Sequence, residues 1–224
     1  MCFSSTASFI GGAVISTIGI ATVMKVHKPS QVLFASIPLF FGFQQIAEGL
    51  VWLSLKSPGN AGLESFATHI FLIMAQVIWP VLIPVSIMHM EKSSKKRKIL
   101  SVFLAVGIIL ACYYSYCLIA FRVHPIIKGY HIQYDTEFPE SLAMVAFVFY
   151  IAATLPPLFM SSIKRMYLFG LLMTFSCLVT GIFYTQYLTS VWCFFAALIS
   201  GVIFWILHEE KKLFNLEKLK LLKI

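Results

Sequence analysis

Apolar residues along this chain form long runs that only short polar segments interrupt. Seven runs are long enough to cross the hydrocarbon core of a bilayer, which takes about 20 residues of helix. The pattern therefore predicts an all-α fold, a polytopic transmembrane bundle of seven helices. The predicted spans cover residues 7–26, 31–55, 64–89, 99–121, 139–161, 166–187 and 188–207.

The composition supports the membrane class. Hydrophobic residues make up 59% of the chain and charged residues 12%, and the mean hydropathy is +0.88. A soluble domain would carry about a quarter charged residues. We expect one transmembrane domain over residues 1–207 and a basic tail over 208–224 at the membrane surface. No length remains for a nucleotide-binding fold, so any chemistry must lie within the bundle or at its ends.

Lysine and arginine residues are unevenly distributed between the two sets of loops. With the N-terminus outside and the C-terminus cytoplasmic, fourteen of these residues fall on the inner side and only Lys56, Arg122 and Lys128 outside. Cytoplasmic loops accumulate positive charge, so we predict this orientation for a multi-pass protein of the cell membrane. The net charge of +8 then reflects topology and contact with anionic membrane lipids, with no nucleic-acid partner.

Glu48 is the only carboxylate that lies well inside a predicted span. Gln44 and Trp52 lie four residues to either side of it and Gln45 lies three before it, so the four share one helical face. A charge at bilayer depth costs at least about 3 kcal/mol, and such residues usually have a function. We predict a ligand or proton site here, with a structural role for Glu48 as the alternative.

The third span carries a second set of polar residues on one face, namely His69, Gln76 and Trp79. At 1.5 Å per residue, His69 lies within about one helical turn of the depth of Glu48. We expect the two side chains to pair across the short connection between these spans. A nearby imidazole would let Glu48 ionise or would relay a proton.

Prolines predict bends in the third and fifth spans. Pro80 and Pro84, like Pro156 and Pro157, have no backbone N–H and leave carbonyl groups without a helical donor. Such carbonyls can bind ions or water. We expect a neighbouring hydroxyl to satisfy them.

Further candidate residues lie towards the predicted outer face. The connection over residues 122–140 holds His131 and Tyr134, and could cap a cavity or be an ordinary solvated connector. Trp192 and Cys193 open the last span, and Cys2 lies at the N-terminus. An interfacial belt of aromatic residues accounts for part of this pattern. A zinc or copper site from His69, His131 and Cys193 is the less favoured reading, and we predict no metal.

Four segments resemble the signature segments of a family of small bacterial integral membrane proteins of unknown function. They read CFSSTASF, QQIAEGLVWL, GYHIQY and SVWCFFAALIS, and the resemblance extends through most of the chain. It implies membership of that family without implying a reaction. The positions that match the family's motifs are Cys2, Ser4, Gln45, Glu48, Trp52, His131, Tyr134, Trp192 and Cys193.

These residues favour an outward-facing polar pocket that binds a small ligand or passes it together with protons. Glu48 would be the protonatable centre. Gln44, Gln45 and Gln76 would supply hydrogen bonds, and Trp52, Trp79 and Trp192 would form the walls.

Two other classes stay open. The chain could be an intramembrane enzyme for a lipid or lipid-linked substrate, with Glu48 or His131 as general base and Cys2 or Cys193 as nucleophile. It could instead be a sensory or assembly subunit without chemistry of its own. No motif identifies a cofactor or a catalytic residue.

Overall fold

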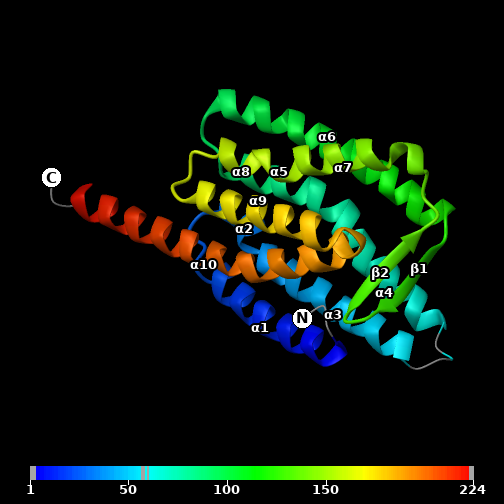
Figure 1. Cartoon of the computed structure of the whole chain (residues 1–224). Helices are drawn as coiled ribbons and strands as arrows, with labels where there is room; N and C mark the ends of the chain where they lie inside the picture. The colour runs from blue at the N-terminus through cyan, green and yellow to red at the C-terminus, as the bar shows by residue number, and fades with distance from the viewer. Residues whose placement is uncertain (1–3, 57–58, 60, 222–224) are drawn as a thin grey trace.

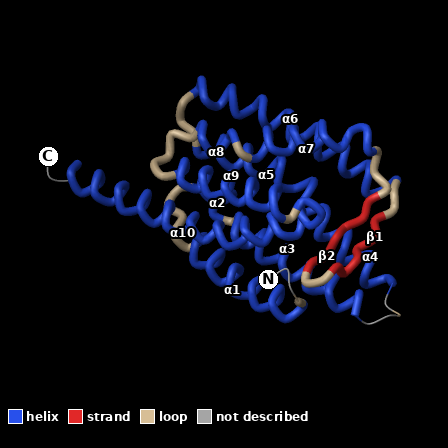
Figure 2. Tube along the Cα trace, in the orientation of Figure 1, coloured by secondary structure: helices blue, strands red, loops and turns tan. Residues whose placement is uncertain are grey.

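The computed structural model is a bundle of long helices with a small β-hairpin at one end (Figures 1 and 2). It describes residues 4–56, 59 and 61–221. In chain order the helices are α1 (Ser5–Val23), the 3-10 turn η1 (Pro29–Gln31), α2 (Val32–Ala35), α3 (Ile37–Lys56), α4 (Ala61–Leu72), the π-helix η2 (Ile73–Ile78), α5 (Trp79–Met90), α6 (Ser94–Ala120), α7 (Glu140–Thr154), α8 (Pro156–Met160), α9 (Met166–Phe183), the 3-10 turn η3 (Thr185–Tyr187) and α10 (Leu188–Leu221).

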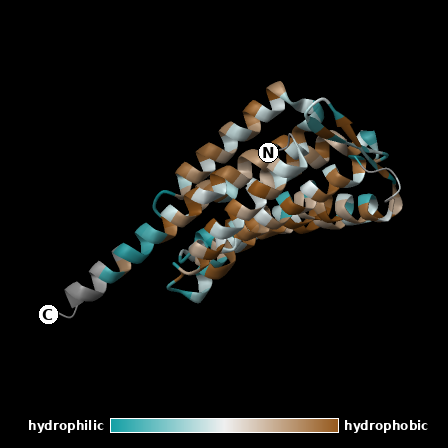
Figure 3. Ribbon diagram, turned by 90° about the horizontal axis from the view of Figure 1, so that it is seen from below, coloured by the Kyte–Doolittle hydropathy of each residue, from teal (hydrophilic) through white to brown (hydrophobic). Residues whose placement is uncertain are grey.

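The prediction of seven transmembrane segments is confirmed. Within the described residues, seven helical segments are long and apolar enough to cross a membrane. Large apolar side chains also cover the outside of the bundle, where Val102, Ile109, Phe175 and Ile182 are each more than half exposed. A soluble protein rarely exposes so much apolar surface. Figure 3 shows the hydrophobic bundle and the hydrophilic end of α10 that extends beyond it.

The third span is one continuous helical path with a π-helical section in the middle. η2 ends just before Pro80, whose missing N–H leaves a carbonyl one turn earlier without a helical donor. The Tyr150 hydroxyl of α7 donates to the Ala75 carbonyl at 2.7 Å. A hydroxyl therefore satisfies the Ala75 carbonyl in this region, and the bond ties α7 to η2. Hydroxyl bonds to the Gln76 and Pro80 carbonyls stay a prediction.

Close backbone contacts join α5 to α6 and α1 to α3. A Cβ atom on Gly107 of α6 would overlap the carbonyl oxygen of Pro80 on α5. A Cβ on Gly12 of α1 would lie 3.0 Å from the carbonyl oxygen of Gly42 on α3. Glycine at these two places lets helices approach more closely than larger residues allow.

The connection between α6 and α7 differs from the loop expected there. It forms an antiparallel hairpin, β1 (Val123–Lys128) and β2 (His131–Thr136), in which Lys128 pairs with His131 across a two-residue turn. Gly129 adopts φ +62° in that turn, a conformation that favours glycine. Ile132 of β2 is fully buried against Val51 and Ala67. The segment is therefore packed on the bundle and is more than a solvated connector.

The last span continues beyond the predicted boundary at residue 207. α10 is one helix from Leu188 to Leu221, and its C-terminal part projects away from the bundle (Figure 1). Attachment of residues 208–224 to a membrane surface stays a prediction.

The two ends of the bundle have different chemistry. We call the end that holds the β-hairpin and η3 the hairpin end. The opposite end, which holds residues 24–30, 91–98, 161–165 and 208–215, is called the basic end. These four segments carry eleven lysine and arginine residues and three glutamates.

Candidate functional site

The polar face predicted on the second span is buried in the middle of the bundle. Gln44, Gln45 and Glu48 have no exposed surface, and Trp52 is 2% exposed. Their spacing of three or four residues places them on the side of α3 that faces neighbouring helices. Buried polar side chains are costly unless hydrogen-bonded, so their partners decide what this site can do.

Gln44 connects three helices through its side-chain amide. The Trp79 indole Nε1–H of α5 donates to Gln44 Oε1 at 2.8 Å. The Gln44 Nε2–H in turn donates to Cys193 Sγ of α10 at 3.0 Å. Trp79 is held in place by Phe41, whose ring stacks on it with 3.9 Å between centroids. The two bonds fix the orientation of the amide, and they make predicted site residues of three spans into one network.

Glu48 lies one turn further along α3, and its partner is a hydroxyl. The Ser190 hydroxyl of α10 donates to Glu48 Oε1, and Ser190 is itself fully buried. Ser190 precedes Cys193 by one turn of α10, just as Gln44 precedes Glu48 by one turn of α3. These two helices therefore meet at two successive levels, one with a carboxylate and one with an amide.

The expected pair of Glu48 and His69 is not present. Both residues are described, and no ion pair joins them. His69 Nδ1 is instead 2.7 Å from the Ser65 carbonyl oxygen in its own helix, at a partly exposed position. The pairing was inferred from depth along two helices alone, and the rotation of each helix about its axis could not be read from the sequence. His69 does not join the network.

Several buried polar groups near the network lack a hydrogen-bond partner among the described residues. They are the Gln45 amide, the Trp52 and Trp192 indole nitrogens, and the Gln76 side-chain oxygen. Such groups cost roughly 1–3 kcal/mol each when left unsatisfied. Native proteins keep few of them without water or a ligand.

Two cavities adjoin the network. The larger, of about 140 Å³, lies between η2, α6, α7 and α10, and the smaller is of about 30 Å³. Both are bordered by Tyr150, Trp192 and Cys193. Gln76 lines the larger cavity, whereas Trp79 lines the smaller one. Tyr150 and Trp192 meet edge to face with 5.6 Å between ring centroids, so they stand where the cavities come together.

Tyr134 of the hairpin packs against the buried clusters that contain Cys193 and Trp52. Tyr134 stacks on Phe71 of α4 with 4.8 Å between centroids. The His131 ring centroid lies 4.8 Å from that of Tyr187 and 5.4 Å from that of Tyr184, both in the segment between α9 and α10. Burial lowers the pKa of His131 below its usual value. Both residues are thus held by aromatic contacts and do not line the 140 Å³ cavity.

The two cysteines and the possible metal site are the remaining predictions from the sequence. Cys193 is a free, buried thiol, and Cys2 lies outside the described residues. His69, His131 and Cys193 do not come together, and no group of three His, Cys, Asp or Glu residues in the described part of the chain could hold a metal ion.

Neither Tyr150 nor Ser190 is among the site residues predicted from the sequence. Tyr150 was recognisable as the lone hydroxyl-bearing aromatic residue within the apolar run AMVAFVFYIAAT. Ser190 precedes Cys193 by three residues, which puts both on one helical face. Their partners on other helices could not be derived from that spacing.

Comparison with known proteins gives membership of a family and nothing further. No curated protein and no solved structure matches the chain. A family model described as "Family of unknown function (DUF6629)" matches residues 1–215. The chain belongs to this family, and the prediction of an uncharacterised family is thereby confirmed.

Proposed function

We propose that this protein binds a small polar ligand inside the bundle, or passes it through the bundle together with protons, with Glu48 as the protonatable group. In this proposal the protein spans the cell membrane with the N-terminus outside and the C-terminus in the cytoplasm. The hairpin end then faces outwards. The lysine and arginine residues of the basic end support this orientation, because cytoplasmic loops accumulate them.

The observation that carries the proposal is a hydrogen-bonded network beside a cavity with unsatisfied polar groups. Gln44 connects Trp79 to Cys193, and Cys193 borders the cavity of about 140 Å³. Gln76 and Trp192 line the same cavity with an acceptor and a donor that lack partners among the described residues. Ligand sites are mostly apolar pockets with a few such polar groups.

Glu48 supplies a means of coupling the ligand to protons. The Glu48–Ser190 and Gln44–Cys193 bonds join the same two helices one turn apart. A ligand that moves α10 at Trp192 or Cys193 would therefore change the surroundings of the carboxylate. Because a charge at this depth is costly, a small change in hydration or hydrogen bonding changes the balance between the protonated and ionised forms.

The alternative of an intramembrane thiol enzyme has less support. Reactive cysteines are partly exposed and lie in electropositive surroundings. Cys193 is buried and contacts the amide of Gln44. The alternative of a sensory or assembly subunit would not need the cavity beside the network.

Native mass spectrometry with lipid and metabolite analysis tests the proposal. We would compare the wild-type protein with Glu48→Gln, which keeps the shape of the side chain but cannot ionise. Glu64→Gln serves as the matched control, because Glu64 lies at the start of α4 and is only partly buried. We expect a bound small molecule in stoichiometric amount in the wild type and in Glu64→Gln, and its loss in Glu48→Gln.

A spectroscopic measurement separates binding from proton coupling. Infrared difference spectra between acidic and alkaline pH should contain a carboxyl band that is absent from Glu48→Gln and present in Glu64→Gln. Recovery of only bulk lipid from all three proteins would contradict the ligand site. A wild-type spectrum identical to that of Glu48→Gln would contradict proton exchange at Glu48.

A further inference from the structure

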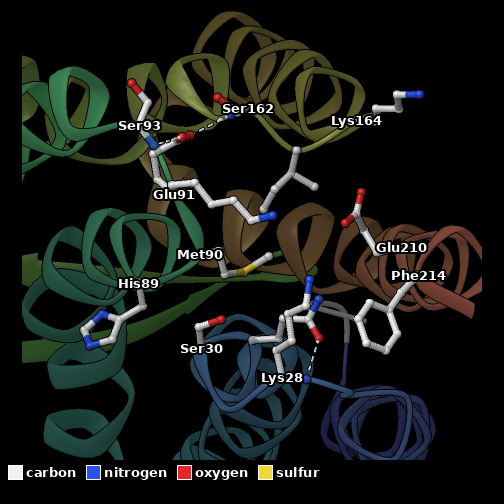
Figure 4. A pocket seen from close by; sticks show the side chains of 13 residues that line it. Lys28, Ser30, His89, Met90, Glu91, Ser93, Ser162, Lys164, Glu210 and Phe214 are labelled. Carbon is white, nitrogen blue, oxygen red and sulfur yellow. Dashed lines mark hydrogen bonds between the residues drawn. The ribbon is translucent and has the colours of Figure 1, made fainter. Parts of the chain in front are cut away.

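The basic end contains a separate cavity that the Glu48 site does not use. Its volume is about 560 Å³, which is within the range of small-molecule sites. Four segments that are far apart in the sequence form its wall, namely the α1–η1 connection, the end of α5 with the following loop, the α8–α9 loop and α10. Its lining is Lys28, Ser30, Gln31, His89, Met90, Glu91, Lys92, Ser93, Ser162, Ile163, Lys164, Glu210 and Phe214 (Figure 4).

One wall of this cavity is held rigidly by a buried carboxylate. Glu91 is 4% exposed and accepts from the backbone N–H of Ser93 at 2.9 Å and of Ser162 at 2.7 Å. Figure 4 shows its carboxylate turned towards these two residues. Lys96 Nζ also donates to the Ser162 hydroxyl at 2.9 Å. Both carboxylate oxygens of Glu91 are therefore already hydrogen-bonded to backbone N–H groups of the cavity wall. These bonds also join the α8–α9 loop to the start of α6.

The cations of the cavity are not neutralised in the same way. Lys28, Lys92 and Lys164 form no ion pair with any described residue. Lys28 lies 5.0 Å from the centroid of the Phe214 ring, and Lys92 and Lys164 are exposed. Glu210 is the second carboxylate in the lining and extends from α10 on the wall opposite Glu91 (Figure 4). The cavity thus keeps more free positive than free negative charge.

Other residues at this end show the same positive surroundings. Burial lowers the pKa of His27, and the charges of Lys28 and Lys211 lower it further. A neighbouring cavity of about 320 Å³ shares Lys92 and adds Arg97 and Lys98. Glu91 and Glu210, which line the cavity of about 560 Å³, do not line the cavity of about 320 Å³.

We propose that the cavity at the basic end binds the phosphate group of an anionic ligand through Lys28, Lys92 and Lys164. A phosphate offers several acceptor oxygens around one centre, which suits flexible lysine side chains supplied by three different segments of the lining. The hydroxyls of Ser30, Ser93 and Ser162 line the same cavity and add donors. The cavity also lies where seven membrane-spanning helices end, which is the depth of lipid headgroups. The ligand is therefore a lipid headgroup or a free phosphate compound, and this proposal is independent of the function proposed for Glu48.

Binding to the full chain in detergent tests the phosphate site. The probes are dioctanoyl phosphatidylglycerol, dioctanoyl phosphatidylcholine and inorganic phosphate, and bound copies are counted by native mass spectrometry over a concentration series. The variant protein carries Lys28→Gln, Lys92→Gln and Lys164→Gln. The control protein carries Lys25→Gln, Lys95→Gln and Lys212→Gln, which lose the same charge at the same end outside the cavity lining.

We expect the cavity variant to bind phosphatidylglycerol at least about tenfold more weakly than the wild type, and the control to change much less. Glu210→Gln should have the opposite effect and tighten binding about threefold, because it removes a like charge. Equal losses in the two triple variants would show only general surface charge and would overturn the proposal. Weaker binding in Glu210→Gln would overturn it as well.

The choice of probes identifies the source of the phosphate. Binding of phosphatidylglycerol alone assigns the site to an anionic lipid headgroup, and binding of inorganic phosphate as well assigns it to the phosphate group itself. Equal binding of phosphatidylglycerol and phosphatidylcholine, unaffected by the lysine changes, would contradict both. If the triple variant does not fold, the pair Lys92→Gln and Lys164→Gln repeats the test at two exposed side chains.

Discussion

The Glu48 network and the cavity at the basic end both hold polar groups, but they hold them in opposite ways. Around Glu48 the polar groups are buried, and hydrogen bonds from other helices hold Gln44 and Glu48. At the basic end the lysines are exposed or partly exposed, whereas the carboxylate Glu91 is buried and bonded at both oxygens. The Glu48 network is thus a closed region, enclosed by packed helices. The cavity at the basic end is an open region, whose lysines are accessible from outside.

The difference follows from the surroundings of each region. Deep in the bundle an unsatisfied polar group has no water to bond with, so its position must be fixed by partners. At the ends of the helices water solvates free lysines, so they can remain unpaired and available to a ligand. Changes in the closed region should therefore alter stability, and changes in the open region should alter binding.

Among the proposed variants, Gly107→Ala should cause the largest loss of stability. In Gly107→Ala the new Cβ would overlap the Pro80 carbonyl oxygen, and backbone cannot move aside as a side chain can. We expect a loss of about 3 kcal/mol in the free energy of unfolding, measured by equilibrium unfolding in mixed micelles. Gly201→Ala is the control, because nothing lies within 4 Å of that Cβ and alanine favours a helix. Equal stability of the two variants would contradict the close contact of α5 and α6.

Two tryptophans separate the effect of a hydrogen bond from that of ring packing. Trp79→Phe removes the donor to Gln44 and leaves a buried oxygen unsatisfied, so we expect a loss of about 2 kcal/mol beyond the packing change. Trp52→Phe removes an indole N–H that has no hydrogen-bond partner in the described chain, and should cost less. The same unfolding titration measures both. If Trp52→Phe lowered the free energy of unfolding more than Trp79→Phe, this would contradict the Trp79–Gln44–Cys193 network.

Glu91 gives a smaller effect, and one that depends on pH. Burial alone would raise its pKa, but the N–H groups of Ser93 and Ser162 outweigh burial and hold the pKa below the usual 4.5. The folded state then binds a proton less readily than the unfolded state. The stabilisation is complete above the unfolded pKa and is lost as the pH falls through the lower folded pKa.

The corresponding variant is Glu91→Gln. We expect it to lose about 1.5 kcal/mol at neutral pH and to differ less from the wild type at acidic pH. Unfolding at a series of pH values measures the difference, with the exposed Glu140→Gln as control. A difference between wild type and Glu91→Gln that grows as the pH falls would contradict the assigned hydrogen bonds.

Most of the fold could be predicted from the sequence because the helical spans are long and uniformly apolar. The predicted spans 7–26 and 99–121 correspond to α1 and α6 within a few residues. The hairpin over β1 and β2 was missed, since the sequence of a polar connection gives no sign of what it packs against. Its decisive feature is the burial of Ile132 on Val51 and Ala67, which is a tertiary contact.

The polar face of the candidate site could be predicted from the sequence, but its contacts with other helices could not. The burial of Gln44, Gln45 and Glu48 together follows from helical spacing, which the sequence contains. The pairing of Glu48 with His69 failed because it required the rotation of two helices about their axes. The actual partners, Ser190 and Cys193, belong to a helix about 145 residues later in the chain, and only packing shows which helices become neighbours.

The sequence by itself determined the membrane class, the seven spans, the unequal charge of the loops and the polar face of α3. These properties depend on residues that are close together in the chain, where hydrophobicity and helical period act directly. The tertiary structure alone decided that Glu48 meets Ser190, that Gln44 joins Trp79 to Cys193 and that three distant lysines surround one cavity. Such contacts are set by how helices rotate and cross when they pack, and no local pattern encodes that choice.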